Sequence, residues 1–247
     1  MENRKIAIVT GGSSGIGFAI ATRLINSDIR TIIIGRNKPK LEHACRMLGN
    51  LSEHIVCDLT DLKELPSIVK TIIGNHKKID ILVNNAGIHL KRPIQDVSDS
   101  DYQQVILNNQ TAMFSLTREV SNFMIANGSG AILNVSSMAS QYGLPEVIAY
   151  AASKSAIEGM TRSMAVELSP KGIRVNCIAP GFIKTDMSSA ALDKDPDRKK
   201  RVLARTPLGR LGNVEEVAEA AFFLVSDSAS FITGVILPVD GGNSIGF

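Results

Sequence analysis

The feature that most restricts the fold is a short apolar strand that runs directly into a glycine-rich turn. The predicted strand covers residues 5–10, and the turn Gly-Gly-Ser-Ser-Gly-Ile-Gly covers residues 11–17. Apolar residues then recur at helical spacing from Phe18 to Ile25. Glycines let backbone N–H groups approach a phosphate closely, and a helix N-terminus adds unpaired donors and the positive end of its dipole. The alternative is a turn that only packs a helix on a sheet. The predicted pyrophosphate site consists of Gly11, Ser13, Ser14, Gly15, Ile16 and Gly17.

Strand and helix patterns alternate along the rest of the chain. Further apolar strands are predicted at residues 31–34, 54–57, 79–83, 130–136, 173–179 and 235–239, the last at an edge of the sheet. Helices are predicted at residues 98–127, 149–168 and 214–225. This alternation is typical of a parallel sheet with helices on both faces, so we predict a doubly wound α/β fold. Residues 186–210 are predicted to form a lid, and a solvated face is the simpler interpretation of the charge run at 195–201.

Composition limits the possible functions. The 247 residues are 44% hydrophobic and 21% charged, which suits one globular domain over residues 1–247. Charges of both signs are scattered and the net charge is only +3, so we expect no nucleic-acid partner. No apolar run could span a bilayer and no signal core follows the N-terminus, so we expect a cytoplasmic protein without membrane association. Cys45, Cys57 and Cys177 lack CxxC spacing, which indicates reduced thiols and no metal site.

The residue after the second strand bears on the choice of dinucleotide. Doubly wound folds usually contact the adenosine ribose here, and a carboxylate at this point bonds the 2′-hydroxyl group. This chain has Gly35-Arg36-Asn37 instead, and a guanidinium matches a phosphate monoester in geometry and charge. The sequence therefore favours NADP(H). If Arg36 is simply solvated, NAD(H) remains usable.

Other predicted cofactor contacts follow later strands, where ligands bind in open α/β sheets. Asp58 follows the third strand and could contact the adenine, and Asp61 could start the next helix, although helix capping is the simpler role for either carboxylate. Asn84-Asn-Ala-Gly87 follows the fourth strand, where a plain turn is the alternative. The predicted contacts from these loops and the loop after the sixth strand are Asp58, Leu59, Asn84, Ala86, Gly87, Pro180, Gly181, Ile183 and Thr185.

A tyrosine and a lysine one helical turn apart suggest the chemistry. Tyr150 and Lys154 lie at i and i+4 of the predicted helix, so both project from one face. A free phenol has a pKa of ~10, and a nearby ammonium favours the phenolate. Lowering that pKa to ~7 requires ~4 kcal/mol, so we expect the positive nicotinamide ring of an oxidised dinucleotide to contribute a second cation. The same spacing is common on solvated helix faces, so the pair alone is a weak signal.

Two further residues belong with this pair. Ser137 ends the apolar run that begins at Gly130, and its hydroxyl could donate a hydrogen bond to a substrate oxygen where negative charge develops. Asn108 and Asn109 are adjacent amides in an otherwise periodic helix, which suggests a local break. An amide there could hold a water molecule beside Lys154, and a buried asparagine that satisfies irregular backbone is compatible with that role.

With these residues in hand, the chain from Ile6 to Gly242 resembles the short-chain dehydrogenase/reductase family. TGxxxGxG corresponds to residues 10–17, NNAG to residues 84–87, and YxxxK to Tyr150 and Lys154. The family's active-site asparagine, its serine, and its PG with a following threonine correspond to Asn109, Ser137, Pro180, Gly181 and Thr185. The resemblance implies a single Rossmann-fold domain whose seven-stranded parallel sheet has the order 3-2-1-4-5-6-7.

The resemblance also implies roles for these residues. Tyr150 would be the general acid/base, Lys154 would lower its pKa and hold the nicotinamide ribose, and both would contact the cofactor. Ser137 would orient the substrate oxygen, Asn109 would support a water-linked proton relay, and Thr185 would contact the nicotinamide carboxamide. The implied reaction is hydride transfer between the nicotinamide and a carbinol carbon. The implied assembly is a homotetramer with the Tyr150 helix at an interface.

The substrate is less constrained, because different stretches resemble two subgroups. Residues 181–187 and 205–212 are similar to 3-oxoacyl-acyl-carrier-protein reductases, for which an acyl carrier protein would be the partner. Those enzymes carry a basic residue before the Ser137 strand, where this chain has Asn127-Gly-Ser-Gly130, although Lys171 could substitute. Residues 84–93 and 109–114 are more similar to gluconate 5-dehydrogenases and sugar dehydrogenases, in which Lys91 or Arg92 could bind a sugar-acid carboxylate. A catalytically inactive dinucleotide-binding protein is a third possibility, disfavoured because all four catalytic residues are present.

Overall fold

The parallel sheet is the centre of the computed structural model, which describes residues 4–185 and 195–246. Its strands follow the order β3-β2-β1-β4-β5-β6-β9, and every neighbouring pair is parallel. The strands are β1 (Ile6–Thr10), β2 (Arg30–Gly35), β3 (Ser52–Val56), β4 (Ile81–Asn84), β5 (Gly130–Val135), β6 (Ile173–Pro180) and β9 (Ile236–Val239). The predicted doubly wound order is confirmed, with β9 as the seventh strand.

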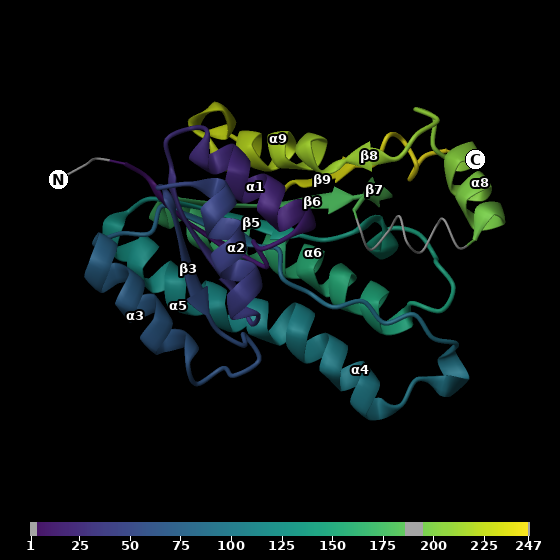
Figure 1. The fold of residues 1–247 in the computed structure, drawn as a ribbon, viewed down its shortest axis with the longest axis horizontal. Coiled ribbons are helices and arrows are strands. Elements are labelled where there is room, and N and C mark those ends of the chain that lie inside the picture. Colours follow the sequence, from purple (N-terminus) through teal and green to yellow (C-terminus); the bar gives the residue numbers. More distant parts are fainter. Residues whose placement is uncertain (1–3, 186–194, 247) are drawn as a thin grey trace.

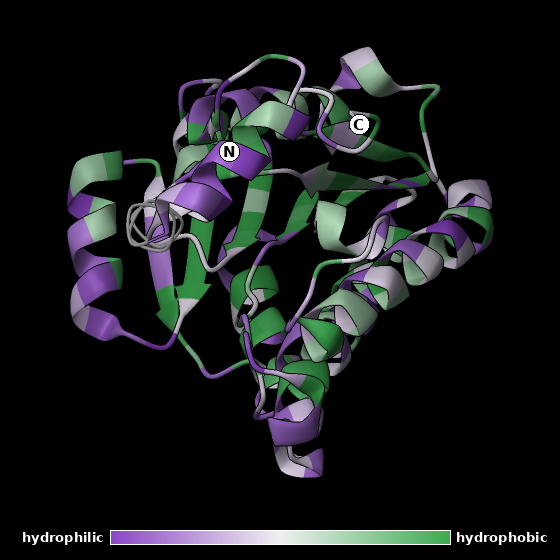
Figure 2. Ribbon diagram, turned by 90° about the vertical axis from the view of Figure 1, so that its right-hand side faces the viewer, coloured by the Kyte–Doolittle hydropathy of each residue, from purple (hydrophilic) through white to green (hydrophobic). Residues whose placement is uncertain are grey.

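Helices cover both faces of this sheet (Figure 1). One apolar cluster joins one face of the sheet to α1 (Gly15–Ile25), α2 (Lys38–Leu48) and α9 (Val214–Val225). A second cluster joins the opposite face to α3 (Leu65–His76), α5 (Ala112–Asn127) and α6 (Ile148–Leu168). Figure 2 shows hydrophobic strands between helices that carry hydrophilic residues. Strands β1 and β4 are buried along their whole length because helices cover both of their faces.

The predicted helix at 98–127 consists of three parts. It begins with α4 (Asp99–Ile106), continues as a π-helical turn (Leu107–Thr111) and ends as α5. The local break predicted from the adjacent asparagines is therefore confirmed. In the described part of the chain, short 3₁₀ turns cover Ile94–Asp96, Met138–Ser140, Ser169–Lys171 and Asp227–Ala229.

The segment between β6 and α9 contains structure that the sequence pattern did not predict. Strands β7 (Ile183–Lys184) and β8 (Gly212–Asn213) pair in parallel as a separate small sheet. Helix α8 (Pro196–Arg205) lies between them in the chain and belongs to the predicted lid, whereas residues 186–194 of that lid fall outside the described residues. Two-residue strands have no periodicity to detect, so only the folded pairing defines them.

Some local expectations need correction. Asp61 does not start the next helix, because α3 begins at Leu65 and Asp61 instead accepts a hydrogen bond from the Lys63 backbone N–H. Cys57 and Cys177 are buried, Cys45 is half-buried, and all three are free thiols. None of the helices in the described part of the chain is long and apolar enough to cross a membrane.

Candidate active site

A cavity of about 1280 Å³ opens at the carboxyl ends of the parallel strands. Loops after β1, β2, β4, β5 and β6 meet there with residues of α6 and α8, as expected for an open α/β sheet. Its volume exceeds the usual ~300–1,000 Å³ of a site for one small ligand, so it has room for a dinucleotide and a substrate. The predicted site residues that line it are Ile16, Arg36, Gly87, Ser137, Tyr150, Lys154, Pro180, Gly181, Ile183 and Thr185.

The glycine turn presents a helix end suited to a pyrophosphate. Ser14 is the N-cap of α1 but makes no side-chain cap hydrogen bond, and the first turn holds no acidic residue. The N–H groups there are consequently not satisfied by a side-chain cap. A Cβ atom on Gly17 would lie 2.4 Å from both the Gly11 carbonyl oxygen and Asn85 Nδ2, so only glycine fits this closely packed turn. Gly15 requires glycine for a different reason, because its φ is +54°.

The loop after β4 is tied to the glycine turn by hydrogen bonds. The Thr10 hydroxyl oxygen accepts from the backbone N–H groups of Asn85 and Ala86 at 2.9 and 3.0 Å, and Asn85 Nδ2 donates to the Thr10 carbonyl at 2.9 Å. Asn84 points the other way, and its Nδ2 donates to Thr117 and Asn134 inside the protein. The side chain of Asn84 therefore does not face the cavity. Asn85, which lines it, was not among the predicted site residues.

Arg36 lies at the end of the cavity reached from β2. Its Nη1 is 3.7 Å from Asp58 Oδ2, and both side chains are largely exposed, so water screens this ion pair. The nearer partner of Asp58 is Thr60, whose backbone N–H and hydroxyl both donate to Oδ1. These bonds and, secondarily, Arg36 hold the pKa of the Asp58 carboxyl below its ordinary value. Asp58 thus stabilises a local turn rather than capping a helix, and the guanidinium remains accessible from the cavity.

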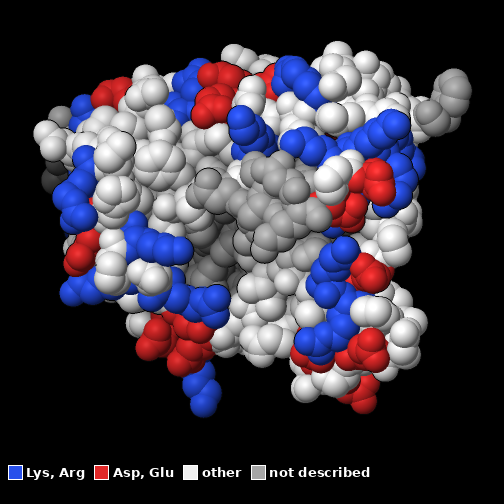
Figure 3. All heavy atoms as spheres, turned by 45° about the vertical axis from the view of Figure 1, so that its right-hand side comes forward, with Lys and Arg blue, Asp and Glu red and all other residues white. Residues whose placement is uncertain are grey.

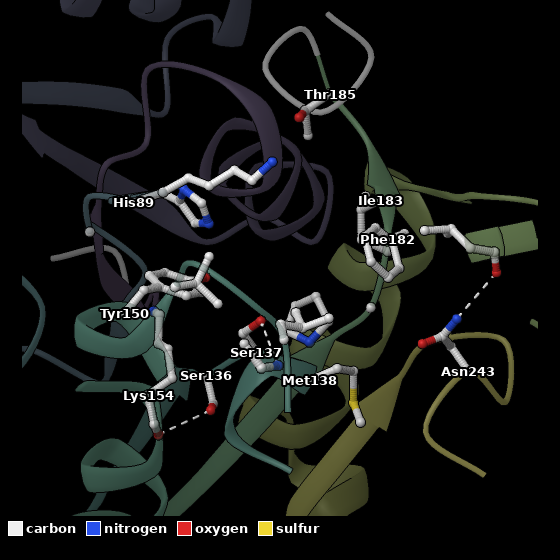
Figure 4. Close-up of a pocket in the computed structure, with 18 of the residues that line it drawn as sticks. His89, Ser136, Ser137, Met138, Tyr150, Lys154, Phe182, Ile183, Thr185 and Asn243 are labelled. Atoms are coloured by element: carbon white, nitrogen blue, oxygen red, sulfur yellow. Dashed lines mark hydrogen bonds between the residues drawn. The ribbon is translucent and has the colours of Figure 1, made fainter. Parts of the chain in front are cut away.

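Tyr150 and Ser137 approach each other from different elements. Tyr150 is in the first turn of α6, and Ser137 precedes the 3₁₀ turn that follows β5 (Figure 4). The Ser137 hydroxyl oxygen accepts a hydrogen bond from the Ala139 backbone N–H, which leaves its own proton for another acceptor. Burial raises the pKa of the Tyr150 phenol, and the Ser137 side chain opposes that rise.

Lys154 is buried one turn along α6 from Tyr150. Its Nζ donates to the Val135 carbonyl oxygen at 2.7 Å and lies 5.6 Å from the centre of the Tyr150 ring. Burial lowers the pKa of this amine to about 8. Burial raises the pKa of the Tyr150 phenol in this structure, so its expected lowering by Lys154 and the nicotinamide stays a prediction for the cofactor-bound site.

Asn109 lies in the π-helical turn, and protein partners hold its side chain. Its Oδ1 accepts from the Ile88 backbone N–H, and its Nδ2 donates to the Ile88 carbonyl and to the Ser153 hydroxyl. A Cβ atom on Gly87 would lie 3.1 Å from Asn109 Oδ1 and 3.8 Å from Lys154 Nζ, so both groups border the same glycine. The amide and the amine therefore come together as predicted, while the water relay stays a prediction.

Comparison with known proteins agrees with this architecture. Residues 11–244 match the sequence family described as enoyl-(acyl carrier protein) reductase. The chain belongs to the short-chain dehydrogenase/reductase (SDR) family. A 3α-hydroxysteroid dehydrogenase from Mediterraneibacter gnavus is 38% identical over 98% of this chain and 97% of its own. The 3-oxoacyl-[acyl-carrier-protein] reductase FabG from Thermotoga maritima is 38% identical over 96% of this chain and 97% of its own.

A solved SDR structure extends the comparison to a sugar acid. It is a candidate NAD(P)-dependent gluconate 5-dehydrogenase from Beutenbergia cavernae with NADP bound at low occupancy. Its TM-score is 0.90, and the 38% identity covers 96% of each chain. The chain is therefore an oxidoreductase of a family that binds NAD(P), and its relatives act on several substrate classes. The uncapped helix end and the closely packed glycines of this SDR chain fit a dinucleotide.

Two features of this SDR site were not predicted from the sequence. Glu158 is buried on α6 and accepts hydrogen bonds from the Ser136 and Ser140 hydroxyls, which flank Ser137. Glu158 lies four residues after Lys154, so helical spacing places both side chains on one face of α6 and could have identified it from the sequence. The second feature is His89, whose ring centre lies 4.8 Å from that of Tyr150. Nothing in the sequence indicated that contact, because it depends on how the loop after β4 crosses α6.

Proposed function

We propose that the chain is an NADP(H)-dependent oxidoreductase that transfers a hydride between the nicotinamide and a secondary alcohol or ketone of a small polyol, sugar or sugar acid. The observation that supports this most strongly is the meeting of Tyr150, Ser137 and Lys154 at one end of the cavity with Arg36 at the other. A dinucleotide extended between those ends would bring its nicotinamide to the phenol and its adenosine ribose to the guanidinium.

The residues have separate tasks in this reaction. In the reductive direction the Tyr150 hydroxyl donates a proton to the forming alkoxide, and in the oxidative direction the phenolate accepts it. The Ser137 hydroxyl proton, left unused by the bond from Ala139, is available for the substrate oxygen. Lys154 holds the nicotinamide ribose and supplies positive charge near the phenol, and Asn109 supports the proton relay. When bound, the nicotinamide supplies or accepts the hydride.

The cavity lining favours a polar substrate. His89, whose ring contacts that of Tyr150, and Arg198 both line the cavity, and they can bond hydroxyl and carboxylate groups better than the apolar rings of a steroid. The candidate gluconate 5-dehydrogenase is one relative with a substrate of this kind. The alternative is reduction of a 3-oxoacyl group on an acyl carrier protein, supported by the similarity to FabG. Against it, the chain lacks a basic residue before β5.

A substrate panel tests this assignment. Purified protein would be assayed with NADPH and with NADH against 5-keto-D-gluconate, neutral ketoses and acetoacetyl thioesters. We expect the keto sugars or the keto acid to be reduced with the higher kcat/KM. Fast reduction of acetoacetyl thioesters together with inactivity on every sugar would replace the proposal with its alternative. No NADPH oxidation with any carbonyl would favour a dinucleotide-binding protein without turnover.

The preference for NADP(H) is tested at Arg36. Replacing Arg36 with Asp puts a carboxylate where the 2′-phosphate would lie, so repulsion should shift the preference toward NAD(H) by at least about tenfold. The ratio of kcat/KM for NADPH to that for NADH measures this shift. Arg36→Gln is a matched variant that removes the charge without reversing it and should give an intermediate ratio. An unchanged ratio in both variants would show that Arg36 does not contact the 2′-phosphate.

We also propose the domain organisation, the assembly and the location of this enzyme. Residues 1–247 would form one domain in which residues 186–210 act as a lid over the substrate. The assembly would be a homotetramer with α6 at an interface, and the location would be cytoplasmic. Exposed apolar side chains on α5 and α6, Phe114 and Val166, support the interface.

A further inference from the structure

Helix α8 contributes three guanidinium groups to the lining of the cavity. Arg198, Arg201 and Arg205 recur at intervals of three and four residues, so they share one face of the helix. Figure 3 shows Lys and Arg side chains interspersed with Asp and Glu side chains on this face of the molecule. Among the described residues, the carboxylates that also line the cavity are Glu146 and Asp195, and both have partners of their own.

The cations expected to bind a carboxylate are already engaged. Lys91 forms an ion pair with Glu146 at 3.1 Å. Arg92 does not line the cavity and instead pairs with Asp101 at 2.5 Å. The sequence-based assignment of an anion to either residue therefore loses its support from the structure.

Arg205 is engaged as well. Its Nε donates to the Asn243 carbonyl oxygen, and its guanidinium lies 4.4 Å from the centre of the Tyr142 ring. The Tyr142 hydroxyl in turn donates to Asn243 Oδ1 at 2.6 Å. These contacts fix the C-terminal end of α8 against the segment that contains Asn243, and they orient the helix face that carries Arg198.

Arg198 differs from these residues. It is half-buried, and within residues 4–185 and 195–246 its guanidinium has no carboxylate within ion-pair distance. Asp195 contacts only its backbone N–H. The positive charge of Arg198 acts on His89, because the pKa of that imidazole is lowered mainly by burial and further by Arg198 and Lys91. A half-buried cation thus lies near the ring that contacts Tyr150.

We infer that Arg198 binds the carboxylate of an anionic substrate, a hydroxy acid or the corresponding keto acid, whose reacting carbon lies at Tyr150. A guanidinium can hold a carboxylate through two parallel hydrogen bonds, which fixes both position and orientation. His89, whose ring contacts that of Tyr150, can bond one of the hydroxyl groups of such a substrate. Arg201, exposed one turn further along α8, adds to the attraction of an anion. This inference rests on the proposed oxidoreductase function.

The test compares two ketones that differ only at the far end. 5-Keto-D-gluconate carries a carboxylate where L-sorbose, its neutral counterpart, carries a hydroxymethyl group. In Arg198→Gln we expect the KM for 5-keto-D-gluconate to rise at least about tenfold, because one charge-assisted contact is lost. The KM for L-sorbose and the Kd for NADPH should change less than about twofold. Arg198→Lys keeps the charge without the bidentate geometry. Its KM for 5-keto-D-gluconate should lie between those of the parent and of Arg198→Gln.

The matched control is Lys200→Gln. Lys200 is on the same helix, is exposed and does not line the cavity, so both ketones should keep their parent KM values. High salt should reduce the parent's preference for the anion and leave L-sorbose unaffected. If Arg198→Gln leaves the ratio of the two KM values unchanged, the inference is wrong.

Other outcomes separate this inference from the proposed function. If the parent reduces L-sorbose as efficiently as the keto acid, the oxidoreductase assignment stands and the carboxylate site is refuted. If the parent reduces only 3-oxoacyl thioesters, the proposed substrate class fails. In that case, the KM values for acetoacetyl-CoA, which carries phosphates, and for the phosphate-free N-acetylcysteamine thioester show which anion Arg198 binds. A loss in Arg198→Gln confined to the CoA thioester would assign Arg198 to a phosphate and overturn the carboxylate proposal.

Discussion

At the scale of single residues, the chemistry depends on the buried amine of Lys154 and the half-buried phenol of Tyr150. The Lys154 amine donates a hydrogen bond to the Val135 carbonyl oxygen, and the centre of the Tyr150 ring lies 5.6 Å from its Nζ. Burial disfavours the charged form of each group, so it lowers the pKa of the amine and raises that of the phenol. A site that ionises Tyr150 near neutrality must therefore overcome burial with positive charge, which is why the proposed mechanism requires both Lys154 and an oxidised nicotinamide.

The lowered pKa of Lys154 predicts a pH dependence of stability. The folded chain releases this proton at about pH 8, while the unfolded chain keeps it up to a pKa of ~10.4. Between these values the unfolded state binds more protons, so the contribution of Lys154 to the free energy of unfolding rises with pH. We expect a rise of about 2 kcal/mol between about pH 7.5 and 9.5. The raised pKa of Tyr150 keeps the phenol out of this window.

The measurement compares Lys154→Met with the parent by urea denaturation at both pH values. Methionine has similar length and no titrating group, so the stability of the variant relative to the parent should fall by about 2 kcal/mol across the interval. Parallel changes in the two proteins would mean that Lys154 titrates at its ordinary pKa.

At the scale of elements, the site is a junction between β5 and α6. The two residues that flank the Ser137 region, Ser136 and Ser140, both donate to Glu158, and Ser136 also bonds the Lys154 carbonyl. One buried carboxylate thereby joins the loop that carries Ser137 to the helix that carries Tyr150 and Lys154. The relative position of the three proposed catalytic side chains depends on this connection.

Removal of that carboxylate should weaken both stability and turnover. Glu158→Ala removes the buried carboxylate that accepts from the Ser136 and Ser140 hydroxyls, so we expect a loss of about 1–3 kcal/mol in the free energy of unfolding. We also expect kcat to fall, because the Ser137 loop is no longer fixed to α6. Glu158→Gln retains an acceptor oxygen and should lose less of both. Parent-like kcat in Glu158→Ala would show that the loop keeps its geometry without this contact.

The elements also show where sequence prediction succeeds and where it stops. The glycine turn and the break at Asn109 were predictable, because φ requirements and helical periodicity are local properties. The directions of the Asn84 and Asn85 side chains were not predictable. The two residues are identical neighbours, and they differ only in which side of the end of β4 each side chain faces. The contact between His89 and Tyr150 is equally invisible, because it joins residues 61 positions apart.

At the scale of the whole molecule, the doubly wound order was predictable from alternating apolar strands and helices. The two-residue strands β7 and β8 were not, because their pairing depends on how the chain returns from α8. Assembly is a further property of this scale. Val166 on α6 is 80% exposed, which leaves a branched apolar side chain facing outward on the helix that carries Tyr150.

The proposed homotetramer predicts that Val166→Glu will dissociate the assembly into smaller species. A charge at the centre of an apolar interface is costly to bury, so the mass measured by light scattering should fall. Met47→Glu is the matched control, because Met47 on α2 is 68% exposed and lies on the opposite face of the sheet. An unchanged mass in Val166→Glu would exclude this face from the interface.

The central claim is that the Tyr150 phenol transfers the proton while the hydride moves in the cavity it shares with Lys154. The most direct test is the turnover of Tyr150→Phe with the best substrate of the panel, together with its Kd for NADPH. The phenylalanine keeps the ring and loses only the hydroxyl, so we expect kcat to fall by about 10²–10⁴-fold and the Kd to change less than about twofold. A variant that turns over at the parent rate would contradict the claim.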